Sequence, residues 1–111
     1  VVSLMEGQIR ITVVGLNEVK RDERNGLSLF IYDGNDSLFD SGSLRREIGD
    51  STELSIQREN QTGQRLEINN DRINLDNILA NPGVSYQQTV DGVQLRIEYI
   101  SARPGTFQED A

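Results

Sequence analysis

Hydrophobic and polar residues alternate along several short stretches of this chain, which is the pattern of β-strands buried on one face. The first stretch predicts a strand over residues 8–14. The second, over residues 27–32, is apolar on both faces, because Phe30 and Tyr32 lie opposite a leucine and isoleucine stripe. Strands with two apolar faces tend to lie in the middle of a sheet. We therefore expect the second stretch to be a central strand.

The clearest alternation begins at Val93, where apolar side chains recur at every second position as far as Tyr99. Asp91 and Gly92 precede it. An Asp-Gly pair is typical of a type I′ turn, whose two central residues both need positive φ. Residues 84–100 are therefore predicted to form a β-hairpin.

The middle of the chain carries weaker signals. Residues 38–39 predict a short strand that the Ser-Gly-Ser sequence at 41–43 interrupts. Residues 54–68 alternate on both sides of a glycine-containing turn at 60–63, which predicts a second hairpin. One helical turn is expected over 76–79, because an Asn-Pro-Gly sequence follows it.

Turn signals separate these stretches every eight to twelve residues or so, and no helical periodicity is sustained. The pattern predicts an all-β fold, namely a small antiparallel β-sandwich of about seven or eight short strands with Greek-key, C2-like or immunoglobulin-like order. A small β-barrel is the alternative. The polar connection over 15–26 is expected to cross between sheets. We expect one domain over 1–102 and a flexible acidic tail over 103–111.

The composition removes most catalytic and metal-binding chemistry. The chain has no cysteine and no histidine. It therefore lacks thiolate nucleophiles, cysteine-rich zinc sites, the usual general base at neutral pH and the commonest transition-metal ligand. We expect no enzymatic activity, no catalytic residue, no metal site and no cofactor.

The net charge of the chain limits the kinds of partner that it can bind. Eighteen acidic and 11 basic residues give a formal net charge of −7, which repels phosphate backbones at long range. No apolar run approaches the roughly 18 residues of a membrane-spanning helix. We therefore expect no nucleic acid partner and no membrane insertion, whereas a small-molecule ligand stays open. The sequence indicates no cellular compartment.

The alternative function is that of a calcium-dependent or carbohydrate-binding module. Its binding site would be formed by the two predicted turns at 33–36 and 60–63. The segment Asp33 to Ser37 has oxygen-bearing side chains at alternate positions. An EF-hand loop would need glycine at Leu38 and glutamate at Leu44. A hairpin turn in which Asp33 caps its own backbone is therefore the favoured interpretation. Sugar stacking has few candidates, since the chain has three Tyr, three Phe and no Trp.

One stretch is similar to the opening of membrane-binding C2 domains: a first strand, a charged loop and then Asn25, Gly26 and Leu27. The acidic residue and the aromatic that follow that turn in C2 domains are Leu29 and Phe30 here. The calcium chemistry of that family is therefore not carried over, and no family is assigned.

The functional hypothesis depends on Phe30 and Tyr32. If the opposite stripe of their strand is core, these aromatic side chains face outward, and another layer, subunit or partner must cover them. We therefore expect a non-catalytic structural or protein-interaction module whose partner is another protein or a second copy of the chain. Self-assembly would use this face or the edges of the sheets.

Overall fold

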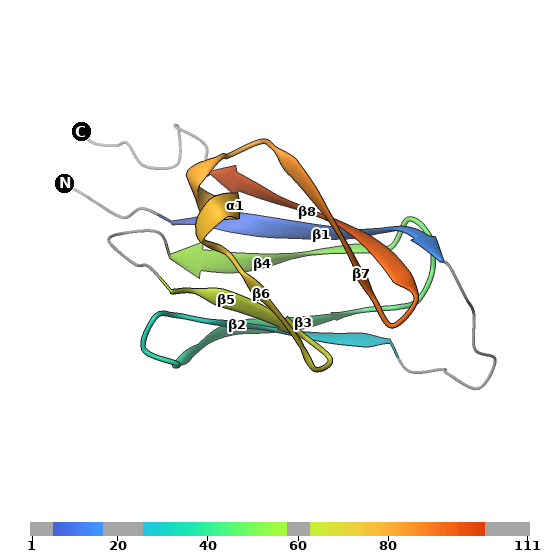
Figure 1. Cartoon of the computed structure of the whole chain (residues 1–111), viewed down its shortest axis with the longest axis horizontal. Coiled ribbons are helices and arrows are strands. Elements are labelled where there is room, and N and C mark those ends of the chain that lie inside the picture. The colour runs from blue at the N-terminus through green and yellow to red at the C-terminus, as the bar shows by residue number, and fades with distance from the viewer. Residues whose placement is uncertain (1–5, 17–25, 58–62, 102–111) are drawn as a thin grey trace.

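The chain folds into two four-stranded antiparallel sheets packed face to face (Figure 1). The computed structural model describes residues 6–16, 26–57 and 63–101. The first sheet has the order β4-β1-β8-β7, with the bounds Ser51–Gln57, Glu6–Leu16, Val93–Ser101 and Ser85–Val90. The second has the order β3-β2-β5-β6, with the bounds Leu38–Leu44, Leu27–Tyr32, Arg65–Ile68 and Asp71–Asn74. A short helix, α1, spans Asp76–Ala80.

This architecture confirms the predicted β-sandwich. Within the described part of the chain, no strand ladder joins β3 to β4 or β6 to β7, so the two sheets do not close into a barrel. β2 lies between β3 and β5, which confirms it as a central strand. β1 is longer than predicted, and a bulge between Val13 and Gly15 shifts its register against β8.

The core lies between the sheets and is built from the alternating apolar positions. In β8 the side chains of Val93, Leu95, Ile97 and Tyr99 are all at most 1% exposed, as the alternation predicts. Their partners across the core include Leu29 of β2, which is fully buried. Burial on this scale is the main favourable term in folding such a chain.

The predicted hairpin before β8 is confirmed. β7 pairs with β8 in antiparallel register, with Val90 opposite Val93. Asp91 and Gly92 have φ angles of 54° and 77°. Positive φ at both central positions is the geometry of a type I′ turn, which matches the twist of the flanking strands.

The second predicted hairpin is wrong, because β4 and β5 lie in different sheets. β4 pairs with β1, placing Leu54 opposite Ile9, whereas β5 pairs with β2, placing Leu66 opposite Ile31. Alternation fixes which face of a strand is buried but not which strand it pairs with. The hairpin partner of β5 is instead β6, across a turn at Asn69.

The predicted break at 41–43 is also wrong, because β3 continues through these residues. Gly42 pairs with Leu29, and a Cβ atom added to it would lie 2.8 Å from Leu54 Cδ2 of β4. Glycine is therefore needed for β3 to lie close to β4, rather than to interrupt the strand.

The edges β3 and β4 close one side of the sandwich. The Asp40 carboxylate of β3 accepts a hydrogen bond of 2.7 Å from the backbone N–H of Ser55 in β4. This contact satisfies a backbone donor at the free edge of β4. The edges of β6 and β7 lie on the other side of the sandwich.

Side chains tie three turns together at one end of the sandwich. Arg46 donates to the backbone carbonyl of Asp91 at 3.1 Å and pairs with its carboxylate at 3.3 Å. Asn69 donates to the same carboxylate at 2.9 Å, and its side-chain carbonyl accepts from the backbone N–H of Ser28 at 3.0 Å. These contacts link the two sheets where their hairpins turn.

The predicted helical turn is confirmed as α1, which buries Ile78 and Leu79 against the core. β1 and β2 lie in different sheets, so the connection over 15–26 does cross between them. Most of that connection, the turn residues 60–62 and the expected tail over 103–111 lie outside the described residues. No helix in the described segments is long and apolar enough to cross a membrane.

Candidate protein-interaction surface

Phe30 and Tyr32 lie on the outer face of the second sheet, as the sequence predicts. The other stripe of β2, including Leu29 and Ile31, is fully buried, so the two aromatic side chains point away from the core. They are half-buried, with ring centroids 6.5 Å apart and ring planes tilted by 45°. Their mutual contact covers part of each ring, and no third layer of described residues lies over them.

Arg65 of β5 holds Tyr32 in place. The register places Arg65 opposite Tyr32, and the guanidinium carbon lies 4.4 Å from the ring centroid. This is the geometry of a cation–π contact. The same guanidinium donates to Asp36 and, at 2.7 Å, to Glu67. These hydrogen bonds raise the pKa of Arg65 further above its ordinary value, at which the guanidinium is already permanently charged.

A bulge in β3 extends the apolar surface. The register between β2 and β3 shifts between Ile31 and Tyr32, so that Leu38 lies opposite Tyr32 and Phe39 is the extra residue. Leu38 is 55% exposed and Phe39 is 37% exposed. We call Phe30, Tyr32, Leu38 and Phe39 the apolar strip.

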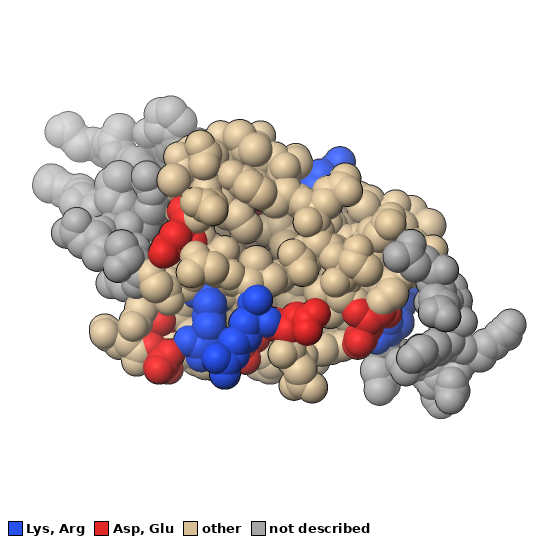
Figure 2. Space-filling model, viewed as in Figure 1, with Lys and Arg blue, Asp and Glu red and all other residues tan. Residues whose placement is uncertain are grey.

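The outer face of the first sheet has a different character. Its exposed positions include Gln8 and Arg10 of β1 and Gln87 of β7. Arg10 forms ion pairs with Glu53 at 2.9 Å and with Glu98 at 3.7 Å. Charged side chains also gather over β5 and β6, next to the apolar strip (Figure 2). The outer face of the second sheet therefore combines aromatic rings with charged groups, whereas that of the first is mainly polar and charged.

Gly34 and Gly63, one from each turn of the alternative function, lie close together, since a Cβ atom added to Gly63 would lie 3.6 Å from Gly34. Asp33 accepts backbone hydrogen bonds from Asn35 at 2.8 Å and Ser37 at 3.0 Å, and Asp36 pairs with Arg65. Both carboxylates therefore have partners from the protein. No group of three or more acidic side chains in the described residues could hold a metal ion.

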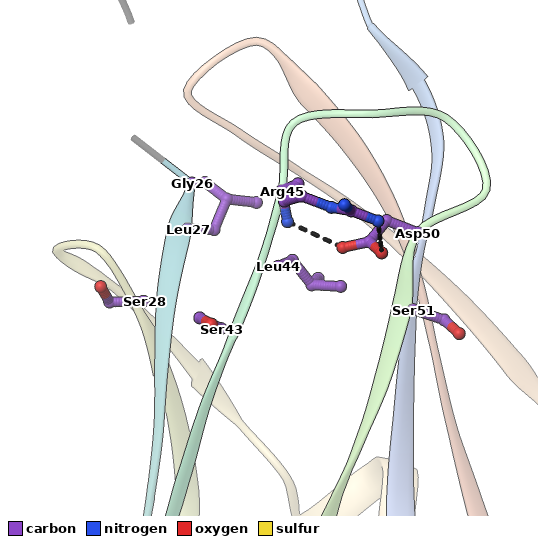
Figure 3. Close-up of a pocket in the computed structure, with 8 residues that line it drawn as sticks. All are labelled: Gly26, Leu27, Ser28, Ser43, Leu44, Arg45, Asp50 and Ser51. Carbon is purple, nitrogen blue, oxygen red and sulfur yellow. Dashed lines mark hydrogen bonds and ion pairs between the residues drawn. The ribbon is translucent and has the colours of Figure 1, made fainter. Parts of the chain in front are cut away.

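A polar cleft of about 560 Å³ lies next to the start of β2. It is lined by Gly26, Leu27, Ser28, Ser43, Leu44, Arg45, Asp50 and Ser51 (Figure 3). Its two charged side chains, Arg45 and Asp50, pair with each other. The carboxylate accepts from the Arg45 backbone N–H at 2.8 Å and from the guanidinium at 3.1 Å.

These contacts predict a pH-dependent contribution from Asp50. The backbone hydrogen bond from Arg45, reinforced by its guanidinium, lowers the pKa of Asp50 below its ordinary value. A pKa lowered by folding adds stability above the unfolded value of about 3.9, and this stability is lost as the pH falls through the folded pKa. We therefore expect Asp50→Asn to lower the melting temperature at neutral pH, and we expect this effect to shrink as the pH is lowered into the acid range.

Thermal melts of both proteins across this pH range measure the effect. Asp71→Asn in β6 is the control, because it changes an exposed carboxylate. A difference between native protein and Asp50→Asn that stays constant with pH would contradict the prediction.

The sequence pattern identifies Phe30 and Tyr32 but not Arg65. The alternation in β5 indicates only that Arg65 faces outward, and its place over Tyr32 follows from the pairing of β5 with β2. The exposure of Leu38 follows from the bulge, for which the sequence around Leu38 carries no local signal.

The chain was compared with families, curated proteins and solved structures. No family model, curated protein or solved structure matches this chain. The function is therefore inferred from the surfaces of the molecule itself.

Proposed function

We propose that this protein is a non-catalytic interaction module that binds a protein partner through the apolar strip. The observation that supports this is the position of Phe30, Tyr32 and the exposed Leu38 on the outer face of the second sheet. A strip of large apolar side chains bordered by charged residues is the composition of an interface with a buried centre and a polar rim.

Arg65 adds to the suitability of this surface. Tyr32 is stacked under its guanidinium, so the ring loses less conformational freedom on binding than a free side chain would. Tyrosine and arginine are also among the residues that contribute most to interface energies. Around them, Asp36 and Glu67 supply opposite charges that can orient a partner.

Photo-crosslinking tests this proposal even while the partner is unidentified. A photoreactive benzoylphenylalanine would replace Leu38 in the full chain, expressed in its source cells. The matched control carries the same group at Gln8, which is exposed on the outer face of the first sheet. We expect a defined protein adduct from position 38 and none of the same mass from position 8. Equal adducts from both positions, or none from position 38, would contradict the proposal.

A point variant then measures the energetics with the partner so identified. Tyr32→Ala removes the aromatic side chain that Arg65 supports, and we expect it to weaken binding by roughly 30-fold or more, as for an interface hot spot. Thr12→Ala in β1 is a control on the other sheet. An unchanged affinity for Tyr32→Ala would remove the apolar strip from the interface.

The second candidate is a calcium-dependent or carbohydrate-binding module that uses the turns around 33–36 and 60–63. Its support is the proximity of Gly34 and Gly63. A rise in melting temperature with millimolar calcium would favour its metal-dependent form, because a ligand that binds only the native state stabilises that state. No change would argue against that form.

A further inference from the structure

The free edge of β7 differs from the other three sheet edges. β3 and β4 lie against each other, with Asp40 bonded to the backbone of Ser55, and β3 carries a bulge. β6 has four residues, including the charged Asp71 and Arg72. Bulges, charges, shortness and covered edges are the devices by which proteins prevent unwanted strand pairing. Three of the four edges therefore have such protection.

β7 has none of these devices. It is six residues long, pairs regularly with β8, and has the sequence Ser-Tyr-Gln-Gln-Thr-Val, with no charge and no proline. The edge is therefore open to another strand.

The turn fixes which backbone groups of β7 face outward. In a two-residue type I′ hairpin, the residues that flank the turn exchange hydrogen bonds, and bonded positions then alternate along the strand. Val90 flanks the turn opposite Val93. The backbone N–H and C=O groups of Thr89, Gln87 and Ser85 therefore point away from β8. Among the described residues, these groups have no backbone partner.

The chemistry of this edge suits a second copy of the same strand. The chain carries a net charge of −7, but β7 itself carries no charge, so two copies can meet there without like charges on the facing strands. An antiparallel pairing centred on Gln87 places Gln87 opposite its own copy, Ser85 opposite Thr89 and Tyr86 opposite Gln88. Hydroxyl and amide pairs of this kind are favourable across antiparallel strands. The same register places Val84, which is 47% exposed, opposite Val90 of the other copy.

From these observations we propose that the protein forms a dimer in which β7 of two copies pairs antiparallel about a two-fold axis at Gln87. The first sheets of both copies join into one eight-stranded sheet. Because each copy uses the one open edge among its described strands, the assembly closes at two chains rather than extending into a fibre. The apolar strip lies on the other sheet and stays accessible in both copies.

A charge exchange at the axis tests the dimer with the full chain. Gln87→Lys places two like charges opposite each other and beside Arg96 of each copy, so this variant alone should be monomeric. Gln87→Glu also places two like charges opposite each other, but its carboxylate lies opposite Arg96 of its own chain, so we expect it to weaken the dimer less. An equimolar mixture should restore the dimer, because lysine then lies opposite glutamate. Gln8→Lys and Gln8→Glu are the matched controls on an exposed position of the same sheet, away from its edge.

Light scattering after size exclusion, at micromolar and submillimolar concentrations, measures the mass. We expect twice the mass of the chain for the native protein, for both Gln8 variants and for the mixture of Gln87 variants. A native protein that stays monomeric at the higher concentration overturns the proposal, as does a dimer that both Gln87 variants retain. A dimer abolished by Leu38→Ser but kept by the Gln87 variants would assign self-association to the apolar strip instead. Failure here leaves the crosslinking result at position 38 unaffected, so the two proposals can fail separately.

Discussion

Leu95→Ala is expected to lower the free energy of unfolding by about 2–5 kcal/mol, the usual cost of truncating a large aliphatic side chain in a packed core. Leu95 is fully buried in β8, a central strand, and its register partners are Val13 in β1 and Gln88 in β7. Because β8 is held on both sides, the surrounding backbone has little freedom to collapse into the resulting cavity.

Leu38→Ala is the matched control, since it removes the same atoms from a side chain that is 55% exposed. We expect it to cost less than about 0.5 kcal/mol, as surface substitutions usually do. Chemical denaturation of the native protein and both variants gives the three free energies. Equal losses for the two variants would mean that the register of β8 is wrong.

Gly26→Ala is expected to have the next largest effect, a loss of about 1–3 kcal/mol or more, in the range of overpacked sites. A Cβ atom at this position would lie 2.0 Å from the backbone carbonyl oxygen of Leu44. Backbone atoms cannot rotate away as a side chain can. The start of β2 would therefore have to separate from the end of β3, where Leu27 pairs with Leu44.

Gly15→Ala is the control for this substitution. Its added Cβ would also meet a close atom, at 2.5 Å, but that atom is the Oε1 at the end of the flexible Gln94 side chain. We expect Gly15→Ala to be much milder than Gly26→Ala in the same denaturation assay. If Gly26→Ala were as stable as the native protein, the close approach of β2 and β3 at this point would be wrong.

The features that the sequence predicts well are local. The hairpin of β7 and β8 follows from an Asp-Gly turn and from alternation that continues to Tyr99. The short helix follows from the Asn-Pro-Gly sequence that ends it. Each of these depends on the conformational preferences of neighbouring residues, so distant parts of the chain do not enter the prediction.

Strand partners are less predictable, because different pairings bury the same side chains equally well. Leu54 and Leu66 would be buried in a hairpin with each other, and they are buried as well in separate sheets. Gly42 is similarly ambiguous, because a strand interior needs glycine only when another strand lies close to it. Both outcomes are decided by tertiary packing.

The apolar strip likewise has features that the local sequence predicts and features that depend on strand pairing. The outward direction of Phe30 and Tyr32 follows from their parity within one strand. The cation–π contact of Arg65 and the position of Leu38 depend on register between strands, which the pattern of single residues does not contain. Similarly, β7 can be recognised as an open edge only once the order of all eight strands is known.

The position of β1 has a consequence for synthesis on the ribosome. β1 pairs with β4 on one side and with β8 on the other. The pairing of β1 with β8 joins the first and the last strands of the described chain, with Gly7 opposite Ser101. Contacts between such distant residues make folding slow, because a long loop must close before they form. The first sheet cannot be completed until β8 has left the exit tunnel. Until then β1 has one unpaired edge, and an exposed strand edge of this kind favours aggregation of the incomplete chain.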